Sequence, residues 1–156
     1  MMKFFIGYVS MSGNTEDIAN ALKESLLLTG CEVEMECLDK IEGNTFLPYD
    51  CIFIGTYTWG DGDLPYEAEG FFDELDRLNL SGKHVACFGS GDYAYPKFCG
   101  AVDVFAEKLE EKGCLVFDQR LKVEFAPETD EQVIECQQFA QSVFEWVVRT
   151  KESELV

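Results

Sequence analysis

The stretch that decides the fold runs from residue 4 to residue 15 and reads Phe-Phe-Ile-Gly-Tyr-Val-Ser-Met-Ser-Gly-Asn-Thr. A short apolar run that ends in a polar, glycine-containing turn is typical of a buried strand. From residue 16 to residue 28 the apolar positions follow helical spacing, and Gly30 suits the C-terminal cap of a helix. A buried strand that leads into a helix through a short turn predicts a parallel sheet with helical crossovers.

The rest of the chain repeats this alternation of strand and helix patterns. Apolar and glutamate residues alternate over 31–37, which predicts a strand with one wet face near a sheet edge. The further strands that we expect are 51–57, 85–89 and 114–125, the last with an irregularity at 118–120. The further helices that we expect are 66–78, 101–112 and 130–149. This order predicts an α/β fold with an open, doubly wound, five-stranded parallel sheet and helices on both faces.

Length and charge limit the classes of protein that fit. A chain of 156 residues suggests one domain, expected over residues 1–150, with a frayed tail at 151–156. Thirty acidic and 12 basic residues give a net charge of −18, which repels nucleic acid and anionic membranes and attracts basic partners.

Cysteine usage and hydropathy point to a reduced, cytoplasmic protein. No apolar run approaches the roughly 18 residues that a membrane span requires, and the first residues are too short for a secretory signal. Seven cysteines without a Cys-x-x-Cys pair, and one histidine, argue against a zinc site or a cysteine–histidine nucleophile. We expect no metal, and we interpret His84 and Trp146 as structural residues.

Three loops follow the carboxyl ends of predicted strands, where open α/β sheets bind their ligands. The first contains Ser10, Met11, Ser12, Gly13, Asn14 and Thr15. Hydroxyl groups and free N–H groups at a helix start favour a phosphate group. No Lys or Arg lies between Lys3 and Lys23, which excludes the nucleoside-triphosphate P-loop. An ordinary helix cap around a glycine turn is the alternative.

The second and third loops contribute aromatic rings. Trp59 lies in a polar stretch, where it must either pack beneath its loop or meet a flat partner. Gly60 and Gly62 permit positive φ, so a peptide there can turn over between two states. The third loop carries Asp92, Tyr93 and Tyr95, with a surface loop as the alternative reading. Together the three loops indicate a site for a flat aromatic mononucleotide.

These residues resemble the flavodoxin family in three motifs that occur in order along nearly the whole chain. The stretch 10–15 resembles the family's phosphate loop, [Ser/Thr]-x-Thr-Gly-x-Thr, with Ser12 in place of threonine. Residues 56–62 resemble the first flavin loop, and residues 88–95 with 98–103 resemble the second. The fifth strand lacks a long inserted loop, as in short-chain flavodoxins. Flavodoxin is itself the type example of strand order 2-1-3-4-5 with FMN at the switch point, so the resemblance supplies that order.

The resemblance implies a role for individual residues. Ser10, Ser12 and Thr15 would hold the FMN phosphate, and Trp59 and Tyr95 would cover the two faces of the flavin. Asp92 and Cys99 match positions at the pyrimidine end of the ring, and the Gly60–Asp61 peptide matches one that flips on reduction. The full cofactor-binding set implied is Ser10, Met11, Ser12, Gly13, Asn14, Thr15, Thr56, Tyr57, Thr58, Trp59, Gly60, Asp61, Ser90, Gly91, Asp92, Tyr95, Phe98 and Cys99.

The function implied is low-potential one-electron transfer, with non-covalent FMN that cycles between semiquinone and hydroquinone. Seven carboxylates between Asp61 and Asp76 would oppose the second electron, although a charge run of this kind also reads as a solvated helix face. The expected partners are a basic flavodoxin reductase as donor and an oxidoreductase as acceptor, both bound transiently by a monomer.

Two other functions fit the same fold class. An FMN-dependent quinone or NAD(P)H oxidoreductase needs a substrate pocket over the flavin, which Trp59 and Tyr95 would cover. A phospho-receiver domain needs paired acidic residues after the first strand and an aspartate after the third. This chain has Ser-Met-Ser-Gly-Asn-Thr and Thr-Tyr-Thr-Trp at those places.

Overall fold

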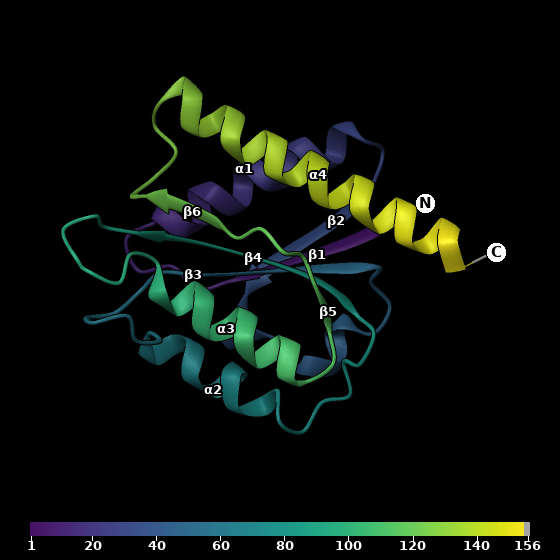
Figure 1. Cartoon of the computed structure of the whole chain (residues 1–156), viewed down its shortest axis with the longest axis horizontal. Helices are drawn as coiled ribbons and strands as arrows, with labels where there is room; N and C mark the ends of the chain where they lie inside the picture. Colours follow the sequence, from purple (N-terminus) through teal and green to yellow (C-terminus); the bar gives the residue numbers. More distant parts are fainter. Residues whose placement is uncertain (155–156) are drawn as a thin grey trace.

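A parallel sheet runs through the middle of the molecule, with strand order β2-β1-β3-β4-β5 and with β6 also paired to β4 (Figure 1). The computed structural model describes residues 1–154. The strands are β1 (Lys3–Tyr8), β2 (Glu32–Cys37), β3 (Cys51–Thr56), β4 (His84–Gly91), β5 (Leu115–Val116) and β6 (Leu121–Glu124). The helices are α1 (Asn14–Leu28), α2 (Tyr66–Glu74), α3 (Gly100–Glu111) and α4 (Asp130–Glu154), with short 3-10 helices η1 (Leu38–Lys40) and η2 (Gly43–Phe46).

The strand pairing confirms the expected parallel fold and the order 2-1-3-4-5. β1 lies between β2 and β3, and β2 is the edge strand, as its alternating glutamates predicted. The fifth position of the sheet is divided into two pieces, because β5 pairs with the beginning of β4 and β6 with its end. Residues 117–120 separate these pieces, which confirms the irregularity expected at 118–120.

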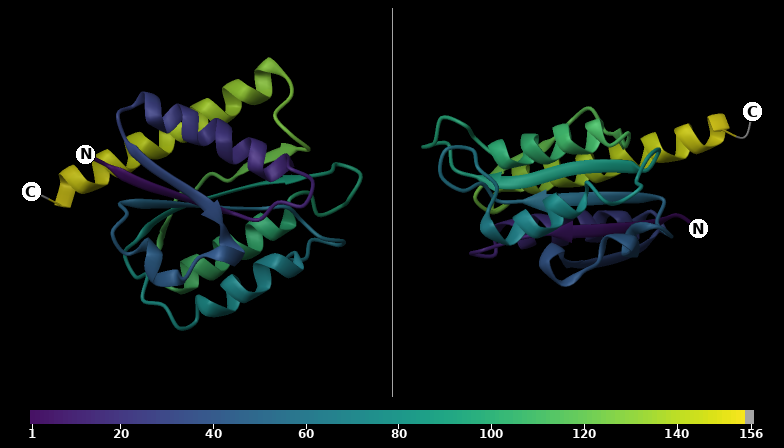
Figure 2. Two further views of the ribbon diagram at one scale, coloured as in Figure 1. Left: turned by 180° about the vertical axis from the view of Figure 1, so that it is seen from behind. Right: turned by 90° about the horizontal axis from the view of Figure 1, so that it is seen from below.

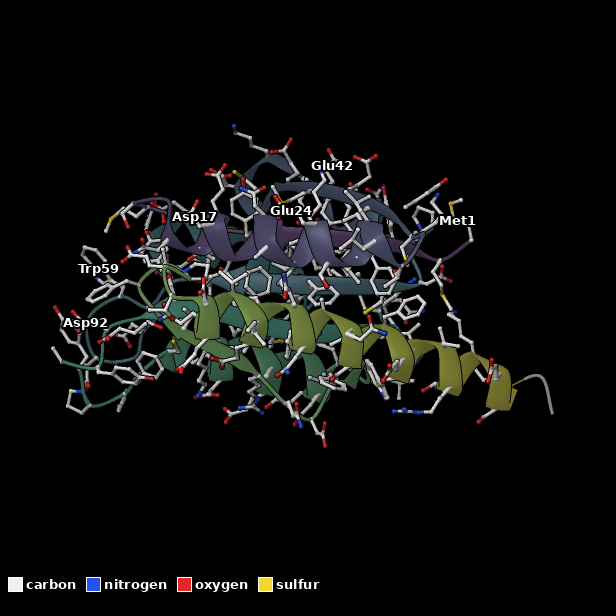
Figure 3. All side chains as sticks on the ribbon, turned by 90° about the horizontal axis from the view of Figure 1, so that it is seen from above. Met1, Asp17, Glu24, Glu42, Trp59 and Asp92 are labelled. Carbon is white, nitrogen blue, oxygen red and sulfur yellow. The ribbon has the colours of Figure 1, made fainter. Side chains whose placement is uncertain are left out.

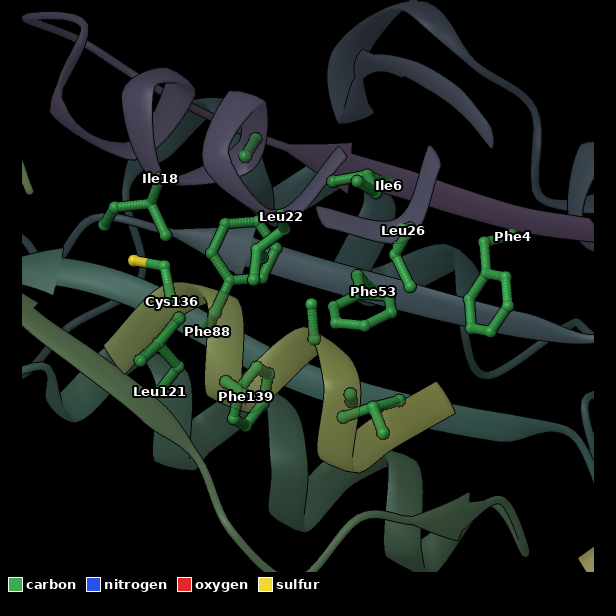
Figure 4. Close-up of a cluster of buried hydrophobic side chains, with 14 of the residues drawn as sticks. Phe4, Ile6, Ile18, Leu22, Leu26, Phe53, Phe88, Leu121, Cys136 and Phe139 are labelled. Atoms are coloured by element: carbon green, nitrogen blue, oxygen red, sulfur yellow. The ribbon is translucent and has the colours of Figure 1, made fainter. Parts of the chain in front are cut away.

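The helices α1 and α4 cover one face of the sheet, and α2 and α3 cover the other (Figure 2). On one face, Ile18 and Leu22 of α1 pack over Phe53 and Phe88 of the sheet, with Phe139 of α4 beside them (Figure 4). Burial of each such side chain contributes about 1.5–3 kcal/mol of transfer free energy. This cluster fixes the position of α1, and therefore of the loop that precedes it.

Aromatic pairs also pack the opposite face, which α2 and α3 cover. The ring of Phe71 on α2 meets that of Phe46 at 5.5 Å, and Phe72 meets Phe105 of α3 at 5.6 Å. Edge-to-face contacts of this kind add to the energy of apolar burial. The first contact joins α2 to η2 and the second joins α2 to α3. These contacts help to fix the positions of both helices and of the loops that precede them.

Two helix ends differ from expectation. α2 ends at Glu74 instead of residue 78, because the chain tightens there into i→i−3 bonds, from Asp76 N–H to Asp73 O and from Arg77 N–H to Glu74 O. α4 continues to Glu154, so the tail expected from residue 151 is helical as far as the structure describes it; residues 155–156 lie outside the described residues. Lys151 Nζ lies 3.2 Å from Asp50 Oδ1, which ties this last turn to the start of β3.

The carboxyl ends of the strands meet at one end of the molecule. Figure 3 places Trp59 and Asp92 together at that end and Met1 at the other. The loops that follow β1, β3, β4 and β6 therefore lie close together, far from Met1 and from the last turn of α4. Within residues 1–154, none of the helices has both the length and the apolar character needed to span a membrane.

Candidate functional site

A cavity of about 190 Å³ lies at the carboxyl ends of β1, β3, β4 and β6. All three loops selected from the sequence contribute to it, together with the loop that follows β6. Its lining residues are Ser10, Met11, Ser12, Asn14, Thr15, Tyr57, Thr58, Gly60, Ser90, Gly91, Asp92, Tyr95, Lys97, Cys99 and Phe125. The lining of the cavity thus combines hydroxyl groups with aromatic rings.

The first loop turns through a left-handed glycine into α1. Gly13 is the N-cap residue, with φ of 92°, a conformation that residues with a side chain resist. Ser10 Oγ accepts hydrogen bonds from the N–H of Gly13 at 3.2 Å and from the N–H of Glu16 at 3.3 Å. The hydroxyl of Ser10 therefore fixes the turn, and the first N–H groups of α1 carry the positive end of the helix dipole toward the cavity.

Thr15 joins the first loop to the sheet. Its buried side chain shares a hydrogen bond of 2.7 Å with Ser90 Oγ of β4, across 75 positions of sequence. Both residues line the cavity, so this bond sets the distance between the start of α1 and the third loop.

The second loop is a tight hairpin that presents its tip beside the cavity. Trp59 and Asp63 exchange two backbone hydrogen bonds of 2.9 Å each, from either N–H to the opposite carbonyl. Gly60 and Gly62 have φ of 52° and 84° within this turn. Residues with a side chain rarely adopt such positive φ values, which accounts for glycine at both positions. Thr58 Oγ1 accepts a hydrogen bond from the N–H of Ala101 at 3.1 Å, which anchors the hairpin to the first turn of α3.

The third loop is held by hydrogen bonds within the loop, by a bond from the N–H of Tyr93 to Glu124 Oε2 of β6 at 3.0 Å, and by stacked rings. Asp92 Oδ1 accepts from the N–H of Ala94 at 2.8 Å, and the carbonyl of Asp92 accepts from the N–H of Tyr95 at 3.1 Å. Tyr93 stacks on Phe98 with ring centroids 4.1 Å apart. Cys99 ends the loop in a left-handed conformation, and burial raises the pKa of its thiol to about 12. The thiol is therefore protonated at neutral pH and is a poor nucleophile.

Most residues expected at the site line the cavity, and five lie beside it. Thr56 is buried under the loop, with its hydroxyl bonded to the carbonyl of Tyr57. Gly13 forms the turn and Phe98 supports Tyr93, as described above. Trp59 is 57% exposed and lines a neighbouring groove, and Asp61 is exposed at the hairpin tip.

Two lining residues were not expected from the sequence. Phe125 was assigned to the last strand, but β6 ends at Glu124 and Phe125 has φ of 57°. Its N–H donates to Gly91 O at 2.9 Å, and its ring is 48% exposed at the cavity. Residues at the carboxyl ends of parallel strands line such sites, and Phe125 meets this criterion once β6 is known to end at Glu124. Lys97 belongs to the third loop, but a single lysine in a loop does not match any sequence motif that would indicate a role at the site.

Lysines offset the acidic stretch 61–76 at both of its ends. Asp61 Oδ2 lies 3.6 Å from Lys97 Nζ. At the other end, hydrogen bonds from Lys108 and Lys112 lower the pKa of Asp76 to about 2. The stretch is therefore less negative than its sequence implies, and its charge is concentrated on the hairpin and the exposed side of α2.

The strand order, the helices on both faces and a cavity at the switch point define a doubly wound α/β protein of flavodoxin-like topology. Comparison with known proteins agrees. The family model for flavodoxin matches residues 6–139. "Probable flavodoxin 1" of Bacillus subtilis is 50% identical over 146 residues, covering 94% of this chain and 92% of that protein. The flavodoxin of Maridesulfovibrio salexigens is 37% identical over 137 residues, covering 84% and 92%.

Solved structures give the same result. Oxidised flavodoxin 2 from Bacillus cereus superposes with a TM-score of 0.89 at 48% identity, covering 92% of this chain and 98% of that one. The chain belongs to the flavodoxin family. Flavodoxins are electron carriers and not enzymes, so this protein is a small electron-transfer flavoprotein.

Proposed function

We propose that the protein binds FMN non-covalently in this cavity and carries single electrons at low potential, cycling between the semiquinone and hydroquinone forms. The observation that carries the proposal is the composition of the cavity, which joins a hydroxyl-rich helix start to aromatic loops. FMN has the matching parts, a phosphate at one end and a flat ring system at the other. When bound, it would supply the one-electron chemistry that the side chains lack.

The first loop suits the phosphate. Ser12, Asn14 and Thr15 line the cavity at the beginning of α1, where free N–H groups and the helix dipole favour an anion. No Lys or Arg lies between Lys3 and Lys23, so hydroxyl and amide groups would hold this phosphate without a cation.

The two other loops suit the ring. Trp59 and Tyr95 are both half-exposed and stand on separate loops, so they are free to cover a ring that extends past the cavity mouth. The Gly60–Asp61 peptide lies at the tip of a hairpin whose base is fixed by the Trp59–Asp63 bonds. A peptide with glycine at one end can turn over at low cost, which would let its carbonyl oxygen accept a hydrogen bond from a ring N–H group after reduction.

Surface charge would set the potential. One carboxylate roughly 10 Å from a site that gains an electron costs about 1.7 kcal/mol at an effective dielectric constant near 20. That cost is equivalent to roughly 70 mV for a one-electron couple. The carboxylates of the hairpin and α2 would therefore make the second electron harder to add, less what salt and neighbouring lysines offset.

The same charge would select partners. A groove beside Trp59 is lined by Asp63, Glu69 and Asp73 around the ring of Phe72. Such a surface suits a basic reductase or acceptor that binds transiently and brings its redox centre to the exposed edge of the ring. We propose accordingly that the protein acts as a monomeric, cytoplasmic electron carrier.

Stepwise anaerobic reduction of the FMN-reconstituted protein, followed by absorption spectroscopy, tests the proposal. We expect a stable blue neutral semiquinone that resists the second electron. Direct bleaching to the two-electron form, or rapid oxidation of NAD(P)H by the protein alone, would instead indicate an FMN-dependent oxidoreductase. A chain that takes up no FMN would refute the proposal altogether.

A further inference from the structure

Lys97 occupies an unusual place among the residues around the cavity. We propose that it is a positioning residue that fixes the hairpin 59–63 against the third loop and supplies the cation that moderates the site's resistance to the second electron. The proposal rests on the binding of FMN proposed above. According to the proposal, Lys97 raises the midpoint potential of the second electron, whereas the surrounding carboxylates lower it.

The side chain of Lys97 lies directly over the hairpin. A Cβ atom added at Gly62 would come within 2.8 Å of Cδ and 3.0 Å of Cβ of Lys97, so the aliphatic stem packs on the glycine backbone. Beyond the stem, Nζ reaches to 3.6 Å from Asp61 Oδ2. Lys97 therefore touches the hairpin at two consecutive residues.

The backbones beneath this contact are also close together. A Cβ atom at Gly100 would lie 2.9 Å from the Cα atom of Gly62, and Thr58 Oγ1 already accepts from Ala101 N–H. The hairpin thus rests on the first turn of α3, and Lys97 covers the contact from outside. Removal of its side chain would leave the Gly60–Asp61 peptide less restrained.

The charge of Lys97 is distinctive at this place. Among the described residues that line the cavity, it alone has a cationic side chain. In a chain of net charge −18, a cation at the mouth lowers the energy of a site that becomes more negative on reduction. It also offsets Asp61, which is adjacent to the peptide proposed to turn over. The electron that reduces the site comes from the donor protein.

Folding stability does not explain the ion pair. The side chains of Lys97 and Asp61 are 64% and 74% exposed, and exposed pairs of this kind contribute little to stability. The proposal therefore places their effect in the properties of the cavity. This separates the proposal from a purely structural role.

The test compares K97M with K112M, a matched control that also loses one lysine paired with an aspartate. Lys112 Nζ lies 3.0 Å from Asp76 Oδ1, on the surface shared by α2 and α3. We measure the dissociation constant for oxidised FMN and both one-electron midpoint potentials at low salt. We expect K97M to lower the midpoint of the second couple by the equivalent of a five- to tenfold change in equilibrium constant, tenfold being about 59 mV. K112M should change it less than twofold.

A second variant makes the sign decisive. D61N removes the opposite charge of the same pair, so it should raise the second midpoint, and K97R should keep the wild-type value. The difference between K97M and wild type should shrink at 0.5 M salt, because screening weakens exposed charges. A variant that merely loosened the loop would not give shifts of opposite sign for the two partners.

The outcomes separate this proposal from the one on which it rests. If the wild-type protein binds no FMN, the proposed function is wrong. If the wild type binds FMN but K97M and K112M have the same second midpoint, or K97M and D61N shift it in the same direction, the role of Lys97 is refuted and FMN binding stands.

Discussion

Gly89, near the end of β4, shows how closely the backbone is packed beneath the cavity. A Cβ atom there would lie 2.2 Å from the carbonyl oxygen of Thr56 on β3 and 2.4 Å from Cγ2 of Val102 on α3. The first contact is with backbone, so no change of rotamer relieves it. We expect G89A to lower the free energy of unfolding by about 3 kcal/mol, measured by urea denaturation.

Gly70 provides the matched control for this substitution. It lies in the interior of α2, and an added Cβ atom would meet nothing within 4 Å. There alanine restricts the unfolded chain and favours the helix, so G70A should raise the free energy of unfolding by about 0.4–1 kcal/mol. Equal losses in the two variants would contradict the packing argument.

His84 makes stability depend on pH. Burial lowers the pKa of its imidazole, Lys151 and Lys83 lower it further, and Glu154 and Asp50 act in the opposite direction. The folded protein therefore favours neutral His84, while the unfolded chain titrates near the ordinary value of about 6.5. The resulting stability is present above that pH and is lost as the pH falls toward the folded pKa, by at most about 1.4 kcal/mol per unit.

Urea denaturation of wild type and H84Q between pH 7.5 and pH 5.5 measures this contribution. The stability of the wild type should fall more steeply than that of H84Q over this interval, since all other groups are common to both. Parallel curves would show that His84 is equally basic in the folded and unfolded chains.

Residues that act through long-range contacts could not be predicted from the sequence. The phosphate loop at residues 10–15 could be predicted, because hydroxyl side chains and a glycine directly before a helix form a pattern that is contained in one short stretch of sequence. Lys97 has no such pattern, since its significance depends on Asp61 at the tip of another loop. Phe125 was missed for a different reason: its apolar side chain continues the strand pattern, but its backbone turns left-handed.

At the scale of elements, the strands were predictable because apolar runs and alternation are read over several residues. The ends of α2 and α4 were not. α2 ends early because its hydrogen bonds change to i→i−3 spacing, and its sequence contains no signal for this change. α4 runs longer because Lys151 reaches Asp50, a contact formed only after the sheet and the helix have packed together. A local change of hydrogen bonding thus ends α2, whereas a tertiary contact accompanies the longer α4.

Ion pairs join the divided fifth strand to α3. Asp103 of α3 accepts hydrogen bonds from Arg120 Nη1 at 2.7 Å and from Lys122 Nζ at 2.8 Å, on either side of the start of β6. Burial raises the pKa of Asp103, but the hydrogen bonds from Lys122 and Arg120 outweigh it and the pKa is lowered. The carboxylate therefore stabilises the folded chain at neutral pH.

We expect D103N to lower the free energy of unfolding by about 1 kcal/mol, a value discounted for the partial exposure of the pair. The control E107Q, at an exposed position of the same helix, should change it by less than about 0.5 kcal/mol. Both are measured by urea denaturation at pH 7. If D103N is as stable as E107Q, the ion pairs do not hold β6 to α3.

At the scale of the whole molecule, a net charge of −18 makes association with a basic partner depend on salt. The groove beside Trp59 is lined by Asp63, Glu69 and Asp73. Trp59 lies at the end of the molecule that carries the cavity (Figure 3). If partners dock there, the triple variant D63N/E69Q/D73N should transfer electrons to cytochrome c, a basic haem protein, about tenfold more slowly at 10 mM salt. At 0.5 M salt the two rates should converge.

A variant with the same loss of charge elsewhere separates local docking from the field of the whole protein. E32Q/E34Q/E152Q removes three exposed carboxylates from the edge strand β2 and the last turn of α4. Stopped-flow rates as a function of ionic strength should then show a flattened dependence for the groove variant and a nearly unchanged one for this control. Equal slopes in the two variants would mean that the total charge, and not the groove, governs encounter. The groove matters only if the position of a carboxylate changes the rate at constant net charge.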